Sequence, residues 1–239
     1  NREQLDRTIE TLPDSVETFN ISSFQVNGIY GRGVISRRQG WRIQPSFELS
    51  GLLGSASFSF QKLTADVRRY YGLSRSTTLA LRARGGVIFN AENDSLPTNQ
   101  RFFNGGTNSV RGFGRQQLGP KRVKLNDDGS FDEFVPTGGR ASLTFNVEIR
   151  QDWNNLIDQF GLAFFLDGGQ VWEDISNLSR SIQYSAGGGF RYDSPIGPVR
   201  FDVGYILNPR DRDLDIFQGQ DFGGSVDRLG FHFSIGQSF

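Results

Sequence analysis

Long runs of alternating apolar and polar residues constrain the fold of this chain most strongly. Between residues 41 and 50 every even position is polar, whereas the odd positions hold Trp41, Ile43, Pro45, Phe47 and Leu49. Similar alternation covers residues 79–89, 143–150, 199–205 and 228–239. Successive side chains of a β-strand point to opposite faces, so each segment is predicted to be a strand with one apolar and one polar face.

Less regular strands are predicted at residues 19–35, 56–73, 160–172 and 182–193. The chain therefore has about nine predicted strands, most of them about ten residues long. That length exceeds the usual five or six residues and suits a strand that crosses a bilayer at a tilt. A water-soluble β-sandwich shows the same alternation, so periodicity alone leaves that architecture open.

Composition excludes several classes of protein. The 239 residues include 26 basic and 26 acidic side chains, so there is no net positive charge to indicate a nucleic-acid partner. The chain has no cysteine and one histidine, which excludes disulfides, a thiol nucleophile and a metal site built from histidines. No apolar run approaches the roughly 18 to 20 residues that a membrane-spanning helix needs.

Two features favour a membrane barrel over a sandwich. The polar faces combine Gly, Arg, Asp and Glu, as suits a water-filled lumen, whereas the apolar faces are rich in Phe, Leu, Ile and Val. The connections are unequal, because the turn at 193–198 is short while the segments 90–139 and 208–227 are long and polar. Short turns at one end and long loops at the other are typical of outer-membrane barrels.

The predicted fold class is therefore all-β. Residues 19–239 are expected to form an antiparallel transmembrane β-barrel, or its C-terminal portion, with about 8 to 10 strands. Residues 1–18 differ from the rest, with apolar residues at helical spacing before Pro13. They are predicted to be a loop or a short helix, at the cut end of a longer chain.

The loop at residues 90–139 contains the candidate functional site. Its apolar and glycine-rich composition predicts an ordered loop, and the residues that stand out are Gly105, Gly106, Val110, Arg111, Gly112 and Phe113. If the loop folds into the lumen, Arg111 needs buried acidic partners, because an unpaired buried guanidinium is costly. Glu148 and Asp167 stand on the next two predicted strands and are the candidates. An arginine exposed to solvent is the alternative.

Several motifs carry a family resemblance. The loop sequence Ser-Val-Arg-Gly-Phe at 109–113, with its lead-in Arg-Phe-Phe-Asn-Gly-Gly at 101–106, resembles the signature loop of the BamA/TamA superfamily of outer-membrane assembly factors. Phe-Leu-Asp-Gly-Gly at 165–169, which includes Asp167 and Gly169, resembles the strand motif that receives the loop arginine. Residues 194–202 resemble the penultimate hairpin, and Phe239 resembles the family's terminal aromatic. The likeness covers residues 40 to 239.

The resemblance implies a barrel of about 16 strands with the signature loop inside it and soluble POTRA modules before it. This chain is then expected to be the C-terminal part, in the bacterial outer membrane. The implied function is assembly and insertion of outer-membrane proteins, with client strands templated at a weak seam between the first and last barrel strands. Implied partners are unfolded outer-membrane protein clients, outer-membrane lipids and accessory periplasmic or lipoprotein subunits.

Arg111 with its partners Glu148, Asp167 and Gly169 is interpreted as a structural latch for the loop. The last strand is interpreted as the seam and targeting strand, with glycines that ease separation; its residues of interest are Gly230, Phe231, Phe233, Ile235, Gly236 and Phe239.

No enzyme activity, cofactor or metal is expected. Ser109 lacks a base, and His232 with Ser234 is interpreted as lumen filling rather than a catalytic pair. The acidic stretch at 127–133 lacks the spacing of a calcium loop. Two alternative functions remain open at this point. One is a protein translocation pore of the same superfamily, of the two-partner secretion or patatin-type autotransporter kind, and the other is a passive porin.

Overall fold

The computed structural model describes residues 21–36, 39–51, 59–89, 96–153, 159–178, 182–195, 197–221 and 227–236. Ten strands form one antiparallel sheet with the spatial order β1-β3-β4-β5-β8-β9-β10-β11-β14, and β2 also pairs with β3. The strands of this sheet are β1 (Ser23–Asn27), β2 (Tyr30–Ser36), β3 (Gln39–Ser50), β4 (Phe60–Gly72), β5 (Thr77–Phe89), β8 (Ala141–Asp152), β9 (Phe160–Trp172), β10 (Gln183–Ser194), β11 (Gly197–Ile206) and β14 (Leu229–Ile235).

Smaller elements lie in the connections. Two separate hairpins are formed by β6 (Lys121–Leu125) with β7 (Phe131–Pro136), and by β12 (Ile216–Phe217) with β13 (Gln220–Asp221). The helices of the described ranges are the single 3-10 turns η1 (Thr98–Gln100), η2 (Ile175–Asn177) and η3 (Asp211–Asp213), none long or apolar enough to cross a membrane.

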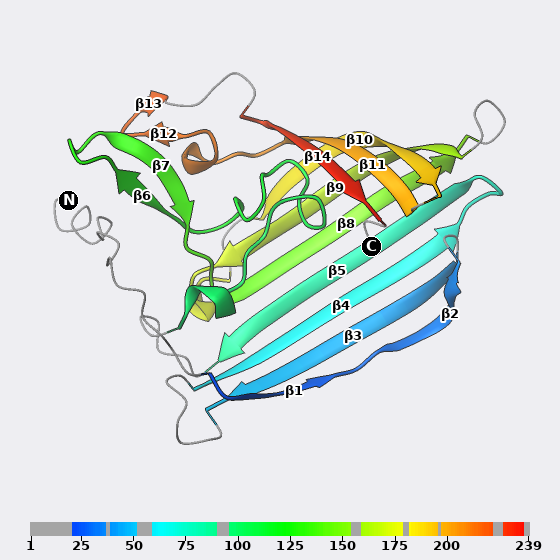
Figure 1. Cartoon of the computed structure of the whole chain (residues 1–239), viewed down its shortest axis with the longest axis horizontal. Coiled ribbons are helices and arrows are strands. Elements are labelled where there is room, and N and C mark those ends of the chain that lie inside the picture. The colour runs from blue at the N-terminus through cyan, green and yellow to red at the C-terminus, as the bar shows by residue number, and fades with distance from the viewer. Residues whose placement is uncertain are drawn as a thin grey trace.

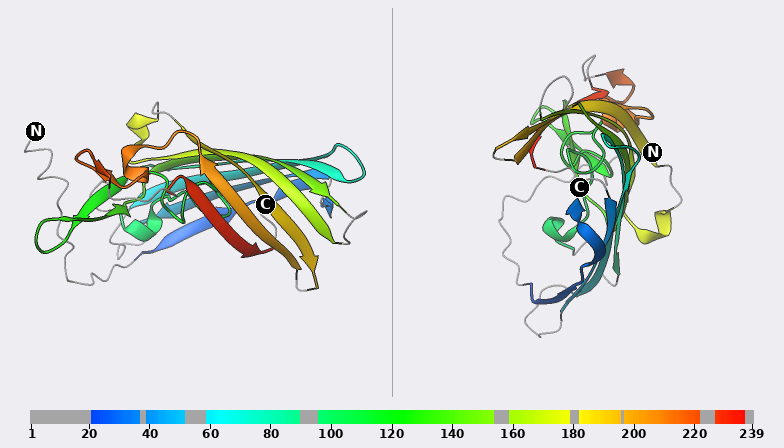
Figure 2. Two further views of the ribbon diagram at one scale, coloured as in Figure 1. Left: turned by 90° about the horizontal axis from the view of Figure 1, so that it is seen from above. Right: turned by 90° about the vertical axis from the view of Figure 1, so that its right-hand side faces the viewer.

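The sheet is a curved meander, as expected from the alternating segments (Figures 1 and 2). The predicted strand at residues 19–35 differs, because it is interrupted into β1 and β2, which pair with successive parts of β3. The interruption lies opposite Pro45, whose carbonyl accepts a hydrogen bond from Gly28 N at 2.9 Å but whose nitrogen has no hydrogen to donate. The described sheet is therefore nine strands wide, because β1 and β2 lie end to end and together form one edge.

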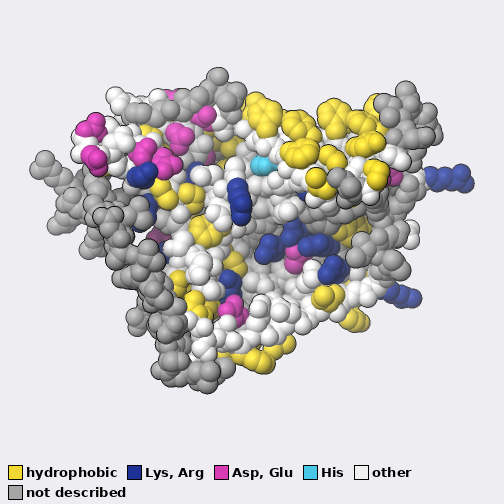
Figure 3. All heavy atoms as spheres, in the orientation of Figure 1, with side chains coloured by type: hydrophobic (Ala, Val, Ile, Leu, Met, Phe, Trp, Pro, Cys, Tyr) yellow, Lys and Arg dark blue, Asp and Glu magenta, His cyan; other side chains and the backbone are white. Residues whose placement is uncertain are grey.

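The two faces of the sheet have opposite character. Large apolar side chains are exposed on the convex face, including Phe47, Leu63, Phe164, Phe190, Phe201, Phe231 and Phe233. Charged side chains are buried on the concave side, including Arg82, Glu148, Asp167, Arg200 and Asp202. Figure 3 shows Lys and Arg side chains gathered on this concave side. An apolar outer face and a polar inner face fit a wall between lipid and a lumen, and they argue against the water-soluble sandwich.

The two rims also differ. Short connections join β2 to β3, β4 to β5, β8 to β9 and β10 to β11, and antiparallel order places all four at one rim. The described hairpins of the longer connections, β6–β7 and β12–β13, lie at the other rim (Figure 1). In outer-membrane barrels the short turns face the periplasm.

The sheet is open within the described residues, with β1 and β2 at one edge and β14 at the other (Figure 1). Its concave face is covered by residues 96–120, between β5 and β6 (Figures 1 and 2). Two small apolar clusters anchor this segment. One contains Val110, Phe113, Leu118, Val171 and Ile206, the other contains Phe60, Ile88 and Leu96, and Phe102 packs against both.

Candidate functional site

The signature loop folds back onto the sheet through a narrow neck. Phe102 and Gly139 exchange two backbone hydrogen bonds of 2.8 and 3.0 Å, and Leu118 N donates to the Asn104 carbonyl at 3.0 Å. These pairs close residues 104–118 into a compact lobe. The predicted loop at 90–139 also contains the β6–β7 hairpin, which the sequence analysis did not anticipate.

Tight turns give the lobe its shape. Gly106 N donates to the Phe113 carbonyl at 3.0 Å, and Phe113 N donates to the Val110 carbonyl at 3.1 Å. Gly105 and Gly106 adopt φ values of 103° and 101°, where side chains are strained. A Cβ on Gly105 would also lie 2.5 Å from the Gly114 carbonyl oxygen, so the turn requires glycine there. Val110 and Phe113 are buried, and the turn between them presents Arg111 to the sheet.

Arg111 is 1% exposed and lies among acids from the neighbouring strands. Its Nε and Nη2 donate to the two Asp167 carboxylate oxygens at 2.7 and 2.8 Å, and its backbone N donates to Asp167 Oδ2 at 3.1 Å. Its Nη1 donates to Glu148 Oε2. The guanidinium carbon lies 3.5 Å from the centre of the Phe165 ring. The structure thus brings together Arg111, Glu148 and Asp167, the three charged residues that the sequence singled out, and we name this group the arginine latch.

A third acid of the site was missed by the sequence analysis. Asp202 on β11 lies 3.8 Å from Arg111 Nη1 and accepts a hydrogen bond from Arg191 Nη1 at 2.6 Å. Arg150 donates to Glu148 Oε1 at 2.7 Å. Three acids, one from each of β8, β9 and β11, are therefore paired with three arginines, and pairing lowers the cost of burying these charges. The position of Asp202 on a polar strand face was visible in the sequence, but the strand pairing was not.

Polar side chains also hold the backbone of the loop tip. Asn146 Nδ2 donates to the Ser109 carbonyl at 2.7 Å, and Gly112 N donates to Ser185 Oγ at 3.1 Å. His232 Nε2 lies 2.7 Å from the Arg111 carbonyl, which can only accept, so this nitrogen carries the proton. His232, interpreted from the sequence as lumen filling, therefore connects the last strand β14 to the loop.

Glycines on the sheet make room for the loop tip. Gly204 and Gly230 face each other across β11 and β14, and a Cβ on either would lie 2.4 or 2.5 Å from the Arg111 carbonyl oxygen. On β9, a Cβ on Gly169 would lie 2.9 Å from Val110 Cγ2. Gly230 was interpreted as a residue that eases strand separation; the structure places it directly beneath the loop.

A second charge cluster supports the tip from the other side. Arg82 on β5 donates to the Asn108 carbonyl at 2.8 Å and pairs with Asp66 on β4 at 2.6 Å. Arg200 Nη2 donates to the Asn108 side chain at 3.3 Å. The loop tip therefore contacts a side chain of β5, which Asp66 of β4 supports, as well as side chains of β8, β9, β10, β11 and β14.

The last strand lies at the open edge of the sheet. β14 pairs with β11, and no other described strand pairs with it. Phe231, Phe233 and Ile235 are 56% to 66% exposed on its outer face. Gly236 has a φ of 112° and ends the strand. Phe239 lies outside the described residues, as do residues 1–18, so the structure does not test the predictions made for them.

The acidic stretch after β6 forms a hairpin turn. Asp128 accepts hydrogen bonds from the Ser130 hydroxyl at 2.6 Å and the Ser130 backbone N at 2.9 Å, and these bonds lower the pKa of Asp128. Lys124 pairs with Asp132 and Glu133 at 2.7 and 3.1 Å. Asp128, Asp132 and Glu133 thus bind side chains of the same hairpin.

Comparison with known proteins decides the family. The Omp85 superfamily domain matches residues 34–239. The chain belongs to the Omp85 superfamily. This membership confirms the resemblance carried by the loop and strand motifs, and with the barrel fold it places the chain in the outer membrane.

The similar proteins include outer membrane protein assembly factor BamA of Neisseria meningitidis, 25% identical over 70% of this chain and 24% of that protein. BamA of Nitratidesulfovibrio vulgaris is 29% identical over 75% of this chain and 20% of that protein. A SAM50-like protein of Schizosaccharomyces pombe is 28% identical over 77% of this chain and 39% of its own length. The chain thus spans a quarter or less of these two BamA proteins and about two fifths of the SAM50-like protein.

A solved structure supports the fold. The crystal structure of BamA from Haemophilus ducreyi lacking POTRA domains 1–3 matches with a TM-score of 0.63 at 20% identity, over 87% of this chain and 41% of that chain. The open sheet of this Omp85 chain therefore corresponds to part of a barrel, as expected.

Proposed function

We propose that this Omp85 protein assembles and inserts outer-membrane β-barrel proteins. The observation that carries the proposal is the similarity to BamA along most of the chain, since those relatives are named as assembly factors. The expected clients are unfolded outer-membrane proteins, helped by accessory periplasmic or lipoprotein subunits.

The edge of β14 supports a template mechanism. A client strand entering lipid must satisfy its backbone N–H and C=O groups, and an available strand edge offers partners for them. β14 has seven residues, fewer than the ten to thirteen of β8 to β11, and is paired on one side among the described strands. Its apolar outer face, which includes Phe231 and Phe233, keeps this edge in the lipid.

The arginine latch has a supporting role in this proposal. His232 joins β14 to the Arg111 carbonyl, and Gly230 lets the loop lie against the same strand. A docked loop therefore holds β14 in register with β11 while its outer edge stays available. The loop would thus prepare the edge strand for pairing without taking part in chemistry.

Disulfide crosslinking tests the template step. These 239 residues have no cysteine, so Ser234→Cys on β14 adds a single thiol to them with little change in size, and any cysteine elsewhere in the full-length protein is replaced by serine. The matched control is Ser142→Cys on β8, a strand paired on both sides by β5 and β9. Each variant of the full-length protein is given a client with one cysteine in its terminal strand, under conditions of active insertion.

The proposal predicts an adduct with Ser234→Cys and little with Ser142→Cys. No adduct at Ser234→Cys while clients are inserted would contradict templating at β14. Ser142 lies on the lumenal face, in register with Gly86 of β5 and one step of alternation from buried Thr144. An adduct confined to Ser142→Cys would therefore favour passage through the lumen, as in a translocation pore.

A further inference from the structure

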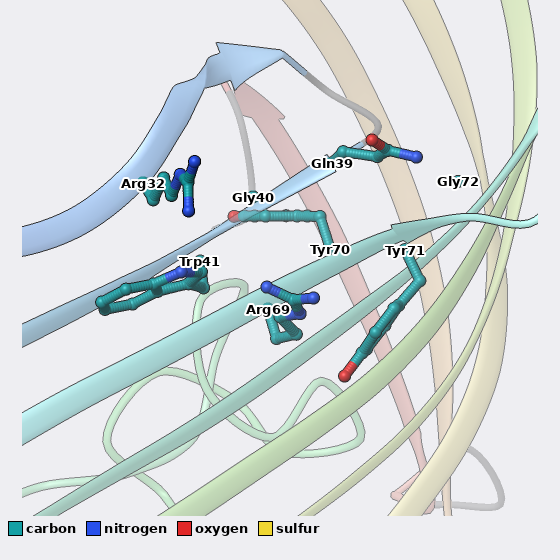
Figure 4. A pocket seen from close by; sticks show the side chains of 8 residues that line it. All are labelled: Arg32, Gln39, Gly40, Trp41, Arg69, Tyr70, Tyr71 and Gly72. Carbon is teal, nitrogen blue, oxygen red and sulfur yellow. The ribbon is translucent and has the colours of Figure 1, made fainter.

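A cleft of about 480 Å³ lies at the short-turn rim, away from the long loops (Figure 4). Its lining comes from β2, β3 and β4 and consists of Arg32, Gln39, Gly40, Trp41, Arg69, Tyr70, Tyr71 and Gly72. β4 ends at Gly72, directly before the short turn to β5. The cleft therefore lies at the periplasmic end of these strands.

The strand register places its arginines on the outer face. Arg32 on β2 is opposite Trp41 on β3, and Trp41 is opposite Arg69 on β4. Directly opposed residues of antiparallel strands point to the same side, so the three side chains share one face. On β4, Leu63 and Val67 are 46% and 40% exposed on that face, three steps and one step of alternation before Arg69. The row formed by Arg32, Trp41 and Arg69 therefore belongs to the lipid-facing surface.

The depth of the row matches the membrane interface. Arg69 is three residues from the end of β4, about 10 Å along the strand. Arginine is poorly tolerated at the middle of the bilayer on a lipid-facing surface, but it is tolerated near the interface. Trp and Tyr gather at the same level in membrane proteins, and here Trp41 and Tyr71 flank Arg69 (Figure 4).

The two arginines carry positive charge that the protein does not neutralise locally. No acidic side chain in the described part of the chain pairs with Arg32 or Arg69. The Arg69 guanidinium lies 4.6 Å from the centre of the Tyr71 ring, and Tyr30 packs edge-on against Trp41 at 5.1 Å. Aromatic contacts orient the side chains while leaving guanidinium N–H groups to bind an anion.

We propose that this cleft binds the phosphate group of an anionic glycerophospholipid from the periplasmic leaflet. Arg32 and Arg69 donate charge-assisted hydrogen bonds to the phosphate oxygens, a geometry that the planar guanidinium favours. The Trp41 ring packs against the glycerol backbone and the first acyl carbons. The volume lies within the range of small-molecule sites. This inference depends on the membrane placement of the strands and is independent of the assembly function.

Native mass spectrometry of the full-length protein in detergent micelles tests the site. Wild type, Arg32→Gln/Arg69→Gln and the control Arg75→Gln are titrated with dioleoyl phosphatidylglycerol, and in parallel with dioleoyl phosphatidylcholine. Arg75 is exposed in the turn after β4, so its substitution removes a charge at the same rim outside the cleft. The inference predicts at least fivefold weaker phosphatidylglycerol binding by the double variant and less than twofold change in Arg75→Gln. Phosphatidylcholine, which carries the same phosphate but no net charge, should bind wild type more weakly than phosphatidylglycerol and should lose less affinity in the double variant.

Two results would overturn the inference. One is phosphatidylglycerol binding by the double variant within twofold of wild type. The other is an equal loss in Arg75→Gln, which would assign the effect to overall charge. If the double variant does not fold, Arg32→Gln alone on β2 is tested instead. It should weaken phosphatidylglycerol binding at least twofold, and unchanged binding would contradict the site. Arg32→Lys/Arg69→Lys, which keeps the charge, should retain binding within threefold.

Discussion

Asp167 accepts three hydrogen bonds from Arg111, two from the guanidinium and one from the backbone nitrogen. Both side chains are at most 1% exposed. Because one of these bonds comes from the main chain, Asp167 fixes the path of the loop as well as the direction of the arginine. Loss of either residue should therefore displace the loop tip.

Replacing Arg111 should destabilise the barrel strongly. Arg111→Ala leaves Glu148 and Asp167 buried with less compensation, and breaking a buried pair in this way costs about 3 to 5 kcal/mol. Arg111→Lys should recover only part of the loss, because an ammonium cannot reproduce the bonds to both acids. The free energy of unfolding from denaturant titration in lipid vesicles measures the effect, and proteolysis reports release of the loop.

Arg115 provides the control for this prediction. It is exposed on the same lobe and its side chain is outside the charge cluster, so Arg115→Ala should change the free energy of unfolding by less than about 0.5 kcal/mol. Equal, wild-type-like behaviour of Arg111→Ala and Arg115→Ala would remove the arginine latch from the account.

Neutralising an acid should release the loop more when that acid contacts Arg111 more closely. Asp167→Asn keeps the shape but removes the charge that accepts from Nε, Nη2 and the backbone, whereas Asp202 is 3.8 Å from Nη1. Asp167→Asn is expected to release the loop to protease at least tenfold faster than wild type. Asp202→Asn should have a smaller effect, and the reverse order would contradict the geometry.

Gly204 should not tolerate even a methyl group. A Cβ there would lie 2.4 Å from the Arg111 carbonyl oxygen, so Gly204→Ala must push the loop tip away from β11, at a cost of about 1 to 3 kcal/mol. Gly85 on β5 is the matched control, because its Cβ would meet its nearest atom at an ordinary 3.6 Å. Similar unfolding free energies for Gly204→Ala and Gly85→Ala would show that the loop does not lie against β11.

His232 should contribute through its hydrogen bond to the Arg111 carbonyl. His232→Ala removes the donor at 2.7 Å and should lower the free energy of unfolding by about 1 kcal/mol, since a buried acceptor loses its partner. Hydrogen exchange of β14 amides should rise in the same variant. Unchanged exchange would indicate that the loop does not steady this strand.

The sequence predicts the strands of the sheet well, because the alternation of apolar and polar residues indicates directly which side chains face lipid. Residues 41–50 and 160–172 correspond closely to β3 and β9. The break between β1 and β2 was missed, since it depends on Pro45 lying opposite Gly28, and that pairing is set by register. The β6–β7 hairpin was missed because its strands are short and exposed in part.

The sequence likewise predicts some residues of the candidate site and not others. Arg111, Glu148 and Asp167 could be proposed together because a buried arginine requires acids, and the following strands carry them. Asp202, Ser185 and His232 could not be assigned, since their contacts depend on which strands the loop tip crosses. Gly230 was assigned to the seam for its low strand propensity, and its contact with the Arg111 carbonyl depends on the same unknown path.

A double-mutant cycle on Arg111 and Asp167 tests the central claim most directly. The free energy of unfolding of the full-length protein in phospholipid vesicles is measured for wild type, Arg111→Ala, Asp167→Ala and the double variant. A lumenal pair predicts a coupling of at least about 1.5 kcal/mol, with the double variant less destabilised than the sum of the single variants. A coupling within about 0.3 kcal/mol of zero would contradict the pairing and, with it, the docked loop.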